Sequence, residues 1–398
     1  MSLFFDRLRT KVSRRAKRGS FLLAHKESIW KRLPDNVLVL ITSFSELEDI
    51  VSLALTCRLL HHRIAKNEYT IAHAFLKIHT RNRVLEDYYD DGIELSPGGD
   101  LTFVSELFPP PPPEYAVGEG HDDAGYTLGY LADLKRCWST CIRLSYHLAD
   151  HVVRQHLETD SLARPLWSSS KTEKEYVYSK AVETLQARLL RPLAYAIFFL
   201  ENSSDDGFNP GSSEHVNDLF TSFQRKLSVL HGPPFNNTRN IILTEHCLQL
   251  LCSTVRRLMH PEFGHSTSEG WVSLLLLNST MERIVDFFHA IAKDDEKTQT
   301  LSHGHGHGHG HGHVSTWSAR QEFLWQMRDD LGHHMASLSN ASAKNGDDIL
   351  TLDHVWFKAA YQEMARRGAI PHSPEELVPV LHGSALKLDC AYCYDDDE

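Results

Sequence analysis

The stretch from Leu33 to Ala65, "LPDNVLVLITSFSELEDIVSLALTCRLLHHRIA", constrains the fold of this chain more than any other. Val37 to Ile41 are five consecutive apolar residues, and Phe44 follows them closely. A surface helix that buries one face shows polar gaps every two or three positions, so this run covers most of a helix circumference. A unit of about 40 residues rarely stabilises itself without a staple or a partner. The surplus apolar surface therefore packs against the rest of this chain or against another protein.

Three short helices are predicted within this stretch. Pro34 suits the first turn of a helix, where its missing N–H costs nothing. The polar segment Ser45–Asp49 ends the first helix, and Asp49 can cap or support the start of the second. The second helix carries the apolar residues between 50 and 55, and the third begins at about Arg58.

The residue pattern of this stretch resembles the F-box. The matching residues, whose spacing fits without a gap, are Leu33-Pro34, Val37-Leu38, Ile41, Asp49-Ile50 and Cys57-Arg58. Three positions depart from the pattern: Asn36 stands where Glu is frequent, Ser45 where Leu is frequent and Leu60 where Trp is frequent. Leu47 is expected to supply the apolar contact that Ser45 lacks. The resemblance covers about a tenth of the chain.

The resemblance implies a function. It implies that the three helices dock onto the Skp adaptor, and through it onto a cullin–RING ubiquitin ligase. Leu33 and Pro34 would anchor this contact. The residues that would line or support it are Val37, Leu38, Ile41, Ile50, Leu53 and Cys57. A receptor of this kind brings a protein target to the ligase and catalyses nothing itself, so no cofactor is expected.

The rest of the chain is predicted to be helical, which makes the fold class all-α, with a three-helix F-box followed by a larger irregular α-helical domain. The predicted segments are a basic arm at 1–32, the F-box with a helical extension at 33–79, a Pro/Gly/acidic linker at 80–125, a helical target-binding domain at 126–389 and an acidic tail at 390–398. The polyproline run at 109–113 is interpreted as a spacer, although such runs also dock SH3 or WW modules.

Apolar residues at steps of three and four predict seven helices in the body. They are expected at 126–157, 175–200 with a kink at Pro192, 214–230, 241–259, 271–293, 317–338 and 353–367, the last beginning at the cap Asp353 and ending at Gly368. No alternating strands and no fixed-period repeat are found, so WD40 propellers and leucine-rich repeats are not expected. The body resembles the non-repeat helical regions that accompany F-boxes in many fungal proteins.

Charge is distributed unevenly along the chain. Residues 1–32 hold ten Lys/Arg and two acids, a charge of +8, so the remainder must carry −11 − 8 = −19. An acidic body argues against nucleic-acid binding outside the arm. The arm is interpreted as a nuclear import signal around "RRAKR", a mitochondrial presequence, a membrane-surface helix or a solvated terminus. An F-box in the mitochondrial matrix would have no ubiquitin ligase to join.

Composition limits the cellular setting. No apolar run approaches the roughly 20 residues of a membrane-spanning helix, and no secretory signal is expected. Seven cysteines, mostly in apolar helical context, are typical of reduced thiols. We therefore expect the cytoplasm, the nucleus or both.

Other motifs offer competing chemistry. Metal binding is conceivable at the alternating His-Gly tract, whose imidazoles are His303, His305, His307, His309, His311 and His313. A low-complexity linker is the simpler interpretation, because a flexible chain fixes no coordination geometry. The pairs Cys137/Cys141, His147/His151 and Cys390/Cys393 each lack further ligands at suggestive spacing, so no metal site is predicted. The rivals to a ligase receptor are an F-box scaffold outside ubiquitination, a histidine-rich metal-binding protein and an enzyme housed in the body.

Overall fold

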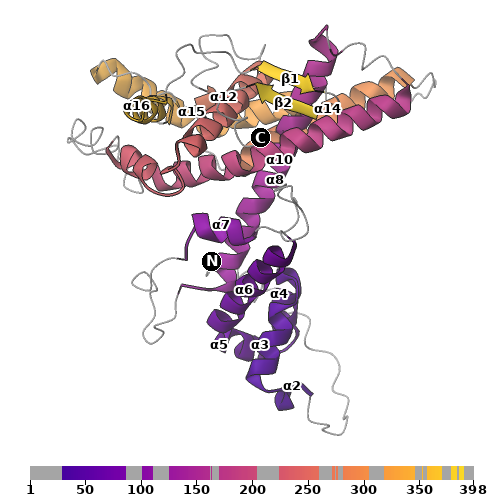
Figure 1. The fold of residues 1–398 in the computed structure, drawn as a ribbon, viewed down its shortest axis with the longest axis vertical. Coiled ribbons are helices and arrows are strands. Elements are labelled where there is room, and N and C mark those ends of the chain that lie inside the picture. Colours follow the sequence, from indigo (N-terminus) through magenta and orange to yellow (C-terminus); the bar gives the residue numbers. More distant parts are fainter. Residues whose placement is uncertain are drawn as a thin grey trace. The chain divides into compact units, whose positions relative to one another are not determined.

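The computed structural model describes about two thirds of the chain in separate segments (Figure 1). These are residues 29–86, 101–110, 125–161, 163, 170–203, 224–259, 271–273, 275–276, 281–303, 318–345, 352, 356–369, 378–382 and 385–389. The chain divides into two compact units. The first comprises 1–93 and 98–138, and the second comprises 94–97 and 139–398. The predicted all-α class is confirmed, with short N-terminal helices followed by longer ones.

The first unit is a small helical bundle. Its helices are α2 (Ile29–Arg32), α3 (Asp35–Ser43), α4 (Leu47–Thr56), α5 (Arg58–Lys66), α6 (Glu68–Glu86), α7 (Leu101–Leu107) and the beginning of α8 (Leu128–Thr159). Helix α3 packs against α6, and α4 packs against α5. The apolar core between them consists of Leu38, Leu47, Ile50, Leu60, Ile64, Ile71 and Phe75. The apolar surplus is thus used in part inside the unit.

Local chemistry fixes the helix boundaries of this unit. Pro34 is the N-cap of α3, and its carbonyl accepts a hydrogen bond from the Leu38 amide at 3.1 Å. Cys57 adopts an extended conformation, with φ −155° and ψ 157°, which ends α4 and starts α5. Helix α4 begins two residues before the predicted Asp49, so this carboxylate lies in the first turn. There it faces the positive end of the helix dipole and supports the start of the helix.

The predicted linker at 80–125 is wrong in two described places. Helix α6 continues to Glu86, and a further helix, α7, occupies residues 101–107. Phe103, Val104 and Leu107 of α7 are buried, and α7 packs against α6. The proline and glycine residues on either side of this seven-residue helix dominated the composition and concealed it. Residues 128–138 of α8 also group with the first unit, so the body does not begin at 126.

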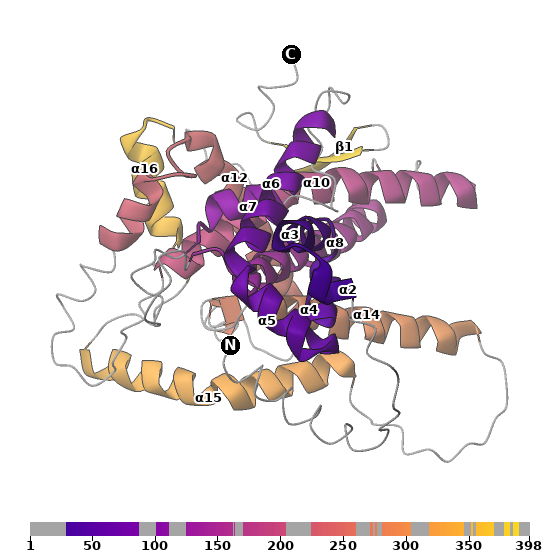
Figure 2. The ribbon, with the colours of Figure 1, turned by 90° about the horizontal axis from the view of Figure 1, so that it is seen from below.

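The second unit is built from long helices. Beyond α8 they are α10 (Lys171–Ser203), α12 (Thr238–Met259), α14 (Met281–His303), α15 (Ala319–Asn345) and α16 (Lys358–Arg366), and residues 224–231 are also helical. Helix α10 packs against α12, and α14 against α15 (Figure 2). Phe199, Phe235 and Trp356 are fully buried together, with the Phe199 and Trp356 ring centroids 4.7 Å apart.

Most of the predicted body helices are observed. Pro192 lies inside α10, which continues past it to Ser203. The predicted end of the last helix at Gly368 is confirmed: this glycine has φ +69°, and the Ala369 amide bonds back to the Met364 carbonyl at 2.9 Å. Asp353, the predicted cap, lies outside the described residues. So does the part of the predicted helix 214–230 that precedes residue 224.

The expectation of no strands is wrong for one short element. Strands β1 (Val378–His382) and β2 (Ala385–Asp389) form an antiparallel hairpin in which Val380 is paired with Lys387. Strand β2 packs against α10, and its Leu386 is fully buried. Two five-residue strands carry too little pattern to be recognised alone, and an isolated hairpin is marginal in water, so packing on α10 stabilises it.

Candidate docking surface on the first unit

Helix α3 has an exposed apolar face. Val37, Leu40, Ile41 and Phe44 follow the i, i+3, i+4, i+7 spacing that places side chains on one side of a helix. Phe44 is 68% exposed, Leu40 56% and Ile41 41%, while Val37 is half-buried. Leu38 is fully buried in the core. Helix α3 therefore carries apolar side chains both on its core side and on this "exposed α3 face", which has no apolar cover among the described residues.

The turn before α3 is held in place by a side chain from α5. Arg63 donates hydrogen bonds to the backbone carbonyls of Trp30 and Leu33 and forms an ion pair with Asp35. The hydrogen bond from Arg63 lowers the pKa of the Asp35 carboxyl. Pro34 is exposed at the turn itself, and Leu33 is half-buried.

A second exposed site lies where α4 meets α5. Leu55 near the end of α4 is 42% exposed, and Cys57 is exposed at the junction. Leu53 is half-buried and Ile50 is fully buried beneath them on α4. The same helix thus supplies core and surface, as α3 does.

The structure divides the eight residues singled out from the sequence into three groups. Pro34, Ile41 and Cys57 are exposed; Leu33, Val37 and Leu53 are half-buried; Leu38 and Ile50 are buried. The buried Leu38 and Ile50 can support a docking surface but do not contact a partner. The prediction from sequence missed three exposed apolar residues on α3 and α4: Leu40, Phe44 and Leu55. Leu40 and Phe44 lie three and seven positions after Val37, but the unbroken apolar run from Val37 to Ile41 does not show that this side of the helix points outward.

The structure shows the surroundings of the three positions that depart from the F-box pattern. The hydroxyl of Ser45 donates to the Ile41 carbonyl at 2.9 Å, which satisfies a carbonyl at the end of α3. Leu47 is buried, as expected of the residue that supplies the apolar contact in place of Ser45. Leu60 is buried in the core, and Asn36 is exposed.

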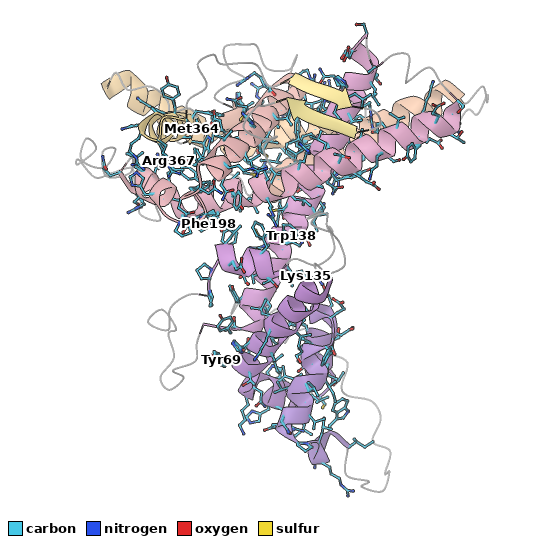
Figure 3. All side chains as sticks on the ribbon, viewed as in Figure 1. Tyr69, Lys135, Trp138, Phe198, Met364 and Arg367 are labelled. Atoms are coloured by element: carbon cyan, nitrogen blue, oxygen red, sulfur yellow. The ribbon has the colours of Figure 1, made fainter. Side chains whose placement is uncertain are left out.

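Helices α6, α7 and α8 brace this bundle. The Glu68 carboxylate on α6 accepts a hydrogen bond from the Leu128 amide at 2.8 Å, which caps the start of α8. Lys135 on α8, which is labelled in Figure 3, forms an ion pair with Glu48 of α4 at 2.7 Å, and this hydrogen bond lowers the pKa of Glu48. Trp138 packs edge-on against Phe103 of α7, with ring centroids 6.1 Å apart. The bundle is therefore larger than the three predicted helices.

Comparison with family models places this geometry in a known class. Residues 30–73 match the model of the F-box-like family. The chain therefore contains an F-box-like domain, which lies in the described N-terminal bundle. Comparison with curated proteins gave no match, and comparison with solved structures gave none either. An F-box suggests a Skp-type adaptor as partner, and F-box proteins are generally non-catalytic subunits.

His147, His151 and Cys141 of α8 belong to the second unit, whereas Cys137 is half-buried in the first unit. His147 stacks on Phe288 and meets His289 edge-on, with ring centroids 4.6 Å apart. Burial and this neighbouring imidazole lower the pKa of His147 to about 4. His151 is hydrogen-bonded with Arg257 at 2.7 Å, and Cys141 is buried. These contacts are those of packed side chains.

Other sequence motifs fall largely outside the described residues. His303 ends α14, but the rest of the His-Gly tract, Cys390, Cys393, the acidic tail and residues 1–28 of the basic arm are not described. Among the described residues, no group of three or more His, Cys, Asp and Glu side chains is arranged to hold a metal ion. In that same part of the chain, no helix is long and apolar enough to cross a membrane.

An ionic cluster around the buried Glu363 fastens α16 in the second unit. Glu363, only 1% exposed, accepts hydrogen bonds from Arg366 at 2.6 Å and Arg367 at 2.5 Å, and His231 lies 3.0 Å away. The hydrogen bond from Arg366, aided by Arg367, lowers the pKa of Glu363 to about 2 in spite of burial. Arg367 also donates to the Leu230 and Asn236 carbonyls, so the cluster joins three chain segments. The charges of the cluster are paired with one another, so we assign the cluster a structural role.

Proposed function

We propose that this protein is the substrate-recognition subunit of an SCF-type (Skp–cullin–F-box) E3 ubiquitin ligase. The observation that carries the proposal is the exposed α3 face, which follows directly on the Leu33–Pro34 turn inside the F-box-like domain. Apolar side chains that are more than half exposed on a short, otherwise well-packed helix favour a protein partner, since water contact costs free energy.

The proposed adaptor contact uses two exposed regions of the first unit. On α3 it includes Pro34, Ile41 and the additional residue Phe44; at the start of α5 it includes Cys57, with Leu53 behind it. Leu33 and Val37 contribute their exposed portions, and the buried Leu38 and Ile50 hold the two helices in position. Aromatic and aliphatic anchors of this kind carry most of the energy of protein interfaces.

The second unit is proposed to hold the protein target. The protein would act in the cytoplasm, the nucleus or both, and its mechanism would be proximity. Binding the adaptor and a target on one chain raises the effective concentration of a target lysine near a charged ubiquitin enzyme. The chain itself would form and break no covalent bond.

The first test is co-purification with the Skp adaptor. Wild type is compared with the Leu33→Ala/Pro34→Ala variant and with Tyr176→Ala, which truncates an exposed side chain in the second unit and serves as the control. Circular dichroism establishes that all three proteins are folded. We expect the wild type and Tyr176→Ala to retain the adaptor and the double variant to lose it. A folded wild type that does not bind would contradict the proposal.

The second test separates a receptor from a scaffold. Reconstituted ligase containing this chain is supplied with ubiquitin and the proteins that co-purify with the second unit. A receptor transfers ubiquitin to at least one of them in an adaptor-dependent reaction. Adaptor binding with no transfer in trans would instead favour an assembly outside ubiquitination.

A further inference from the structure

One arginine on α5 organises the turn that begins the candidate adaptor surface. The Arg63 Nε donates to Asp35 Oδ1 at 2.9 Å, Nη1 donates to the Trp30 carbonyl at 2.5 Å and Nη2 donates to the Leu33 carbonyl at 2.5 Å. These partners lie 28 to 33 residues earlier in the chain. A single guanidinium thus joins α5 to α2, to the turn and to the start of α3.

The acceptors that Arg63 satisfies have few alternatives in the chain. Helix α2 has only four residues, and the last carbonyls of a helix have no intrahelical partner. The Trp30 and Leu33 carbonyls belong to this unsatisfied end. A guanidinium presents five N–H donors in a planar fork and can reach several acceptors at once, which a lysine ammonium on a flexible stem does far less well.

Arg63 is too buried to contact a docked protein directly. Its side chain is only 13% exposed, and its donors point into the chain. Pro34, which lies between the Leu33 carbonyl and the Asp35 side chain that Arg63 bonds, is exposed. Any effect of Arg63 on a docked protein must therefore pass through the turn.

We propose that Arg63 is a positioning residue for adaptor binding, which holds the Leu33–Pro34 turn in the conformation that presents Pro34 at the head of the exposed α3 face. The inference rests on the proposed adaptor-binding function. With Arg63 in place the turn is ordered before the partner arrives. Without it, the turn must be ordered during binding, and that loss of conformational freedom reduces affinity.

The test is a double-mutant cycle between Arg63 and Pro34. The affinity of the full chain for purified Skp adaptor is measured for wild type, Arg63→Ala, Pro34→Ala and the double variant. Lys66→Ala is the matched control, because Lys66 is one turn away and approaches Asp35 only to 3.9 Å without bonding the turn carbonyls. Arg63→Lys, which keeps the charge, is included in case Arg63→Ala does not fold.

We expect Arg63→Ala to weaken adaptor binding about tenfold in the wild-type background but less than about twofold in the Pro34→Ala background, since residues that act as a unit are non-additive. Arg63→Lys should behave like Arg63→Ala, and Lys66→Ala like wild type. Urea unfolding of each variant measures its stability separately. Run at the temperature of the binding assay, it shows whether every variant is folded there.

Two results would overturn the inference alone. One is equal weakening by Arg63→Ala in both backgrounds, which would mean that Arg63 acts independently of Pro34. The other is unchanged affinity in a folded Arg63→Lys variant. If wild type itself does not bind the adaptor, the proposed function fails, and this inference fails with it.

Discussion

Truncation of Phe44 tests the exposed α3 face most directly. Phe44 is 68% exposed, and an aromatic side chain has roughly 150–250 Å² to bury, so about 100–170 Å² is available to a partner. At roughly 25 cal/mol per Å² this area corresponds to about 2.5–4 kcal/mol. Alanine keeps the β-carbon, so we expect Phe44→Ala to lose about 2–3 kcal/mol of binding free energy. This is a roughly 30- to 150-fold rise in Kd for the Skp adaptor.

The same substitution should change the stability of the folded state very little. An exposed side chain away from caps and ion pairs changes the free energy of unfolding by about 0.5 kcal/mol or less. Isothermal titration calorimetry measures Kd, and urea unfolding measures stability. Tyr361→Ala is the matched control, since Tyr361 is 59% exposed on α16 in the second unit. The loss should persist at high salt, because apolar contacts are not screened.

The reasoning has a clear refutation. If Phe44→Ala binds the adaptor within about twofold of wild type while Pro34→Ala binds poorly, the exposed α3 face is not part of the interface. The apolar surplus would then be covered by another partner or another segment. If Phe44→Ala lowers stability by more than about 1 kcal/mol, the side chain is packed in solution and the exposed fraction used above does not apply.

Further predictions concern the core, two of the groups whose pKa is perturbed and the His-Gly tract. Leu38→Ala should cost about 2–5 kcal/mol of unfolding free energy by urea titration, because it leaves a cavity in the core. Glu363 has a folded pKa of about 2 against an ordinary 4.5, so its stabilisation is complete above pH 4.5 and is lost as pH falls towards 2. Glu363→Gln should remove that pH dependence and cost about 2–4 kcal/mol at pH 7. His147 has a folded pKa of about 4 against 6.5, so the unfolded chain binds the extra proton and stability falls as pH drops from 6.5 to 4; His147→Asn should flatten this slope in thermal melts. Deletion of residues 303–313 should leave adaptor affinity unchanged in calorimetry, whereas a metal-handling protein would lose its function.

The helices of the F-box region could be predicted because their signals are local. Pro34 marks a boundary through its own backbone preference, and the structure starts α3 directly after it. The surplus of apolar residues over a single buried face was equally visible. The sequence does not tell which residues of the run point outward, because five consecutive apolar positions carry no polar gap to set the phase of the helix.

Contacts between distant residues could not be predicted. Arg63 bonds groups about 30 positions earlier, and Glu68 caps a helix that begins at Leu128. Neither pair has a spacing that any periodic pattern detects. Glu363 is similar: a single carboxylate in a charged helix reads as solvent-exposed, and only the fold brings His231 to it and buries it.

The boundary between the two units could not be predicted from composition, because it depends on how α7 packs. Proline- and glycine-rich flanks predicted a continuous linker between the F-box and the body, yet α7 lies between those flanks and buries Phe103 against Trp138. A seven-residue helix has almost no stability of its own, because nucleation is costly and few bonds follow it. It forms because α6 and Trp138 of α8 offer it apolar surface. The unit that presents the exposed α3 face therefore extends to Trp138, well past residue 73 where the family match ends, and adaptor binding should depend on that whole unit.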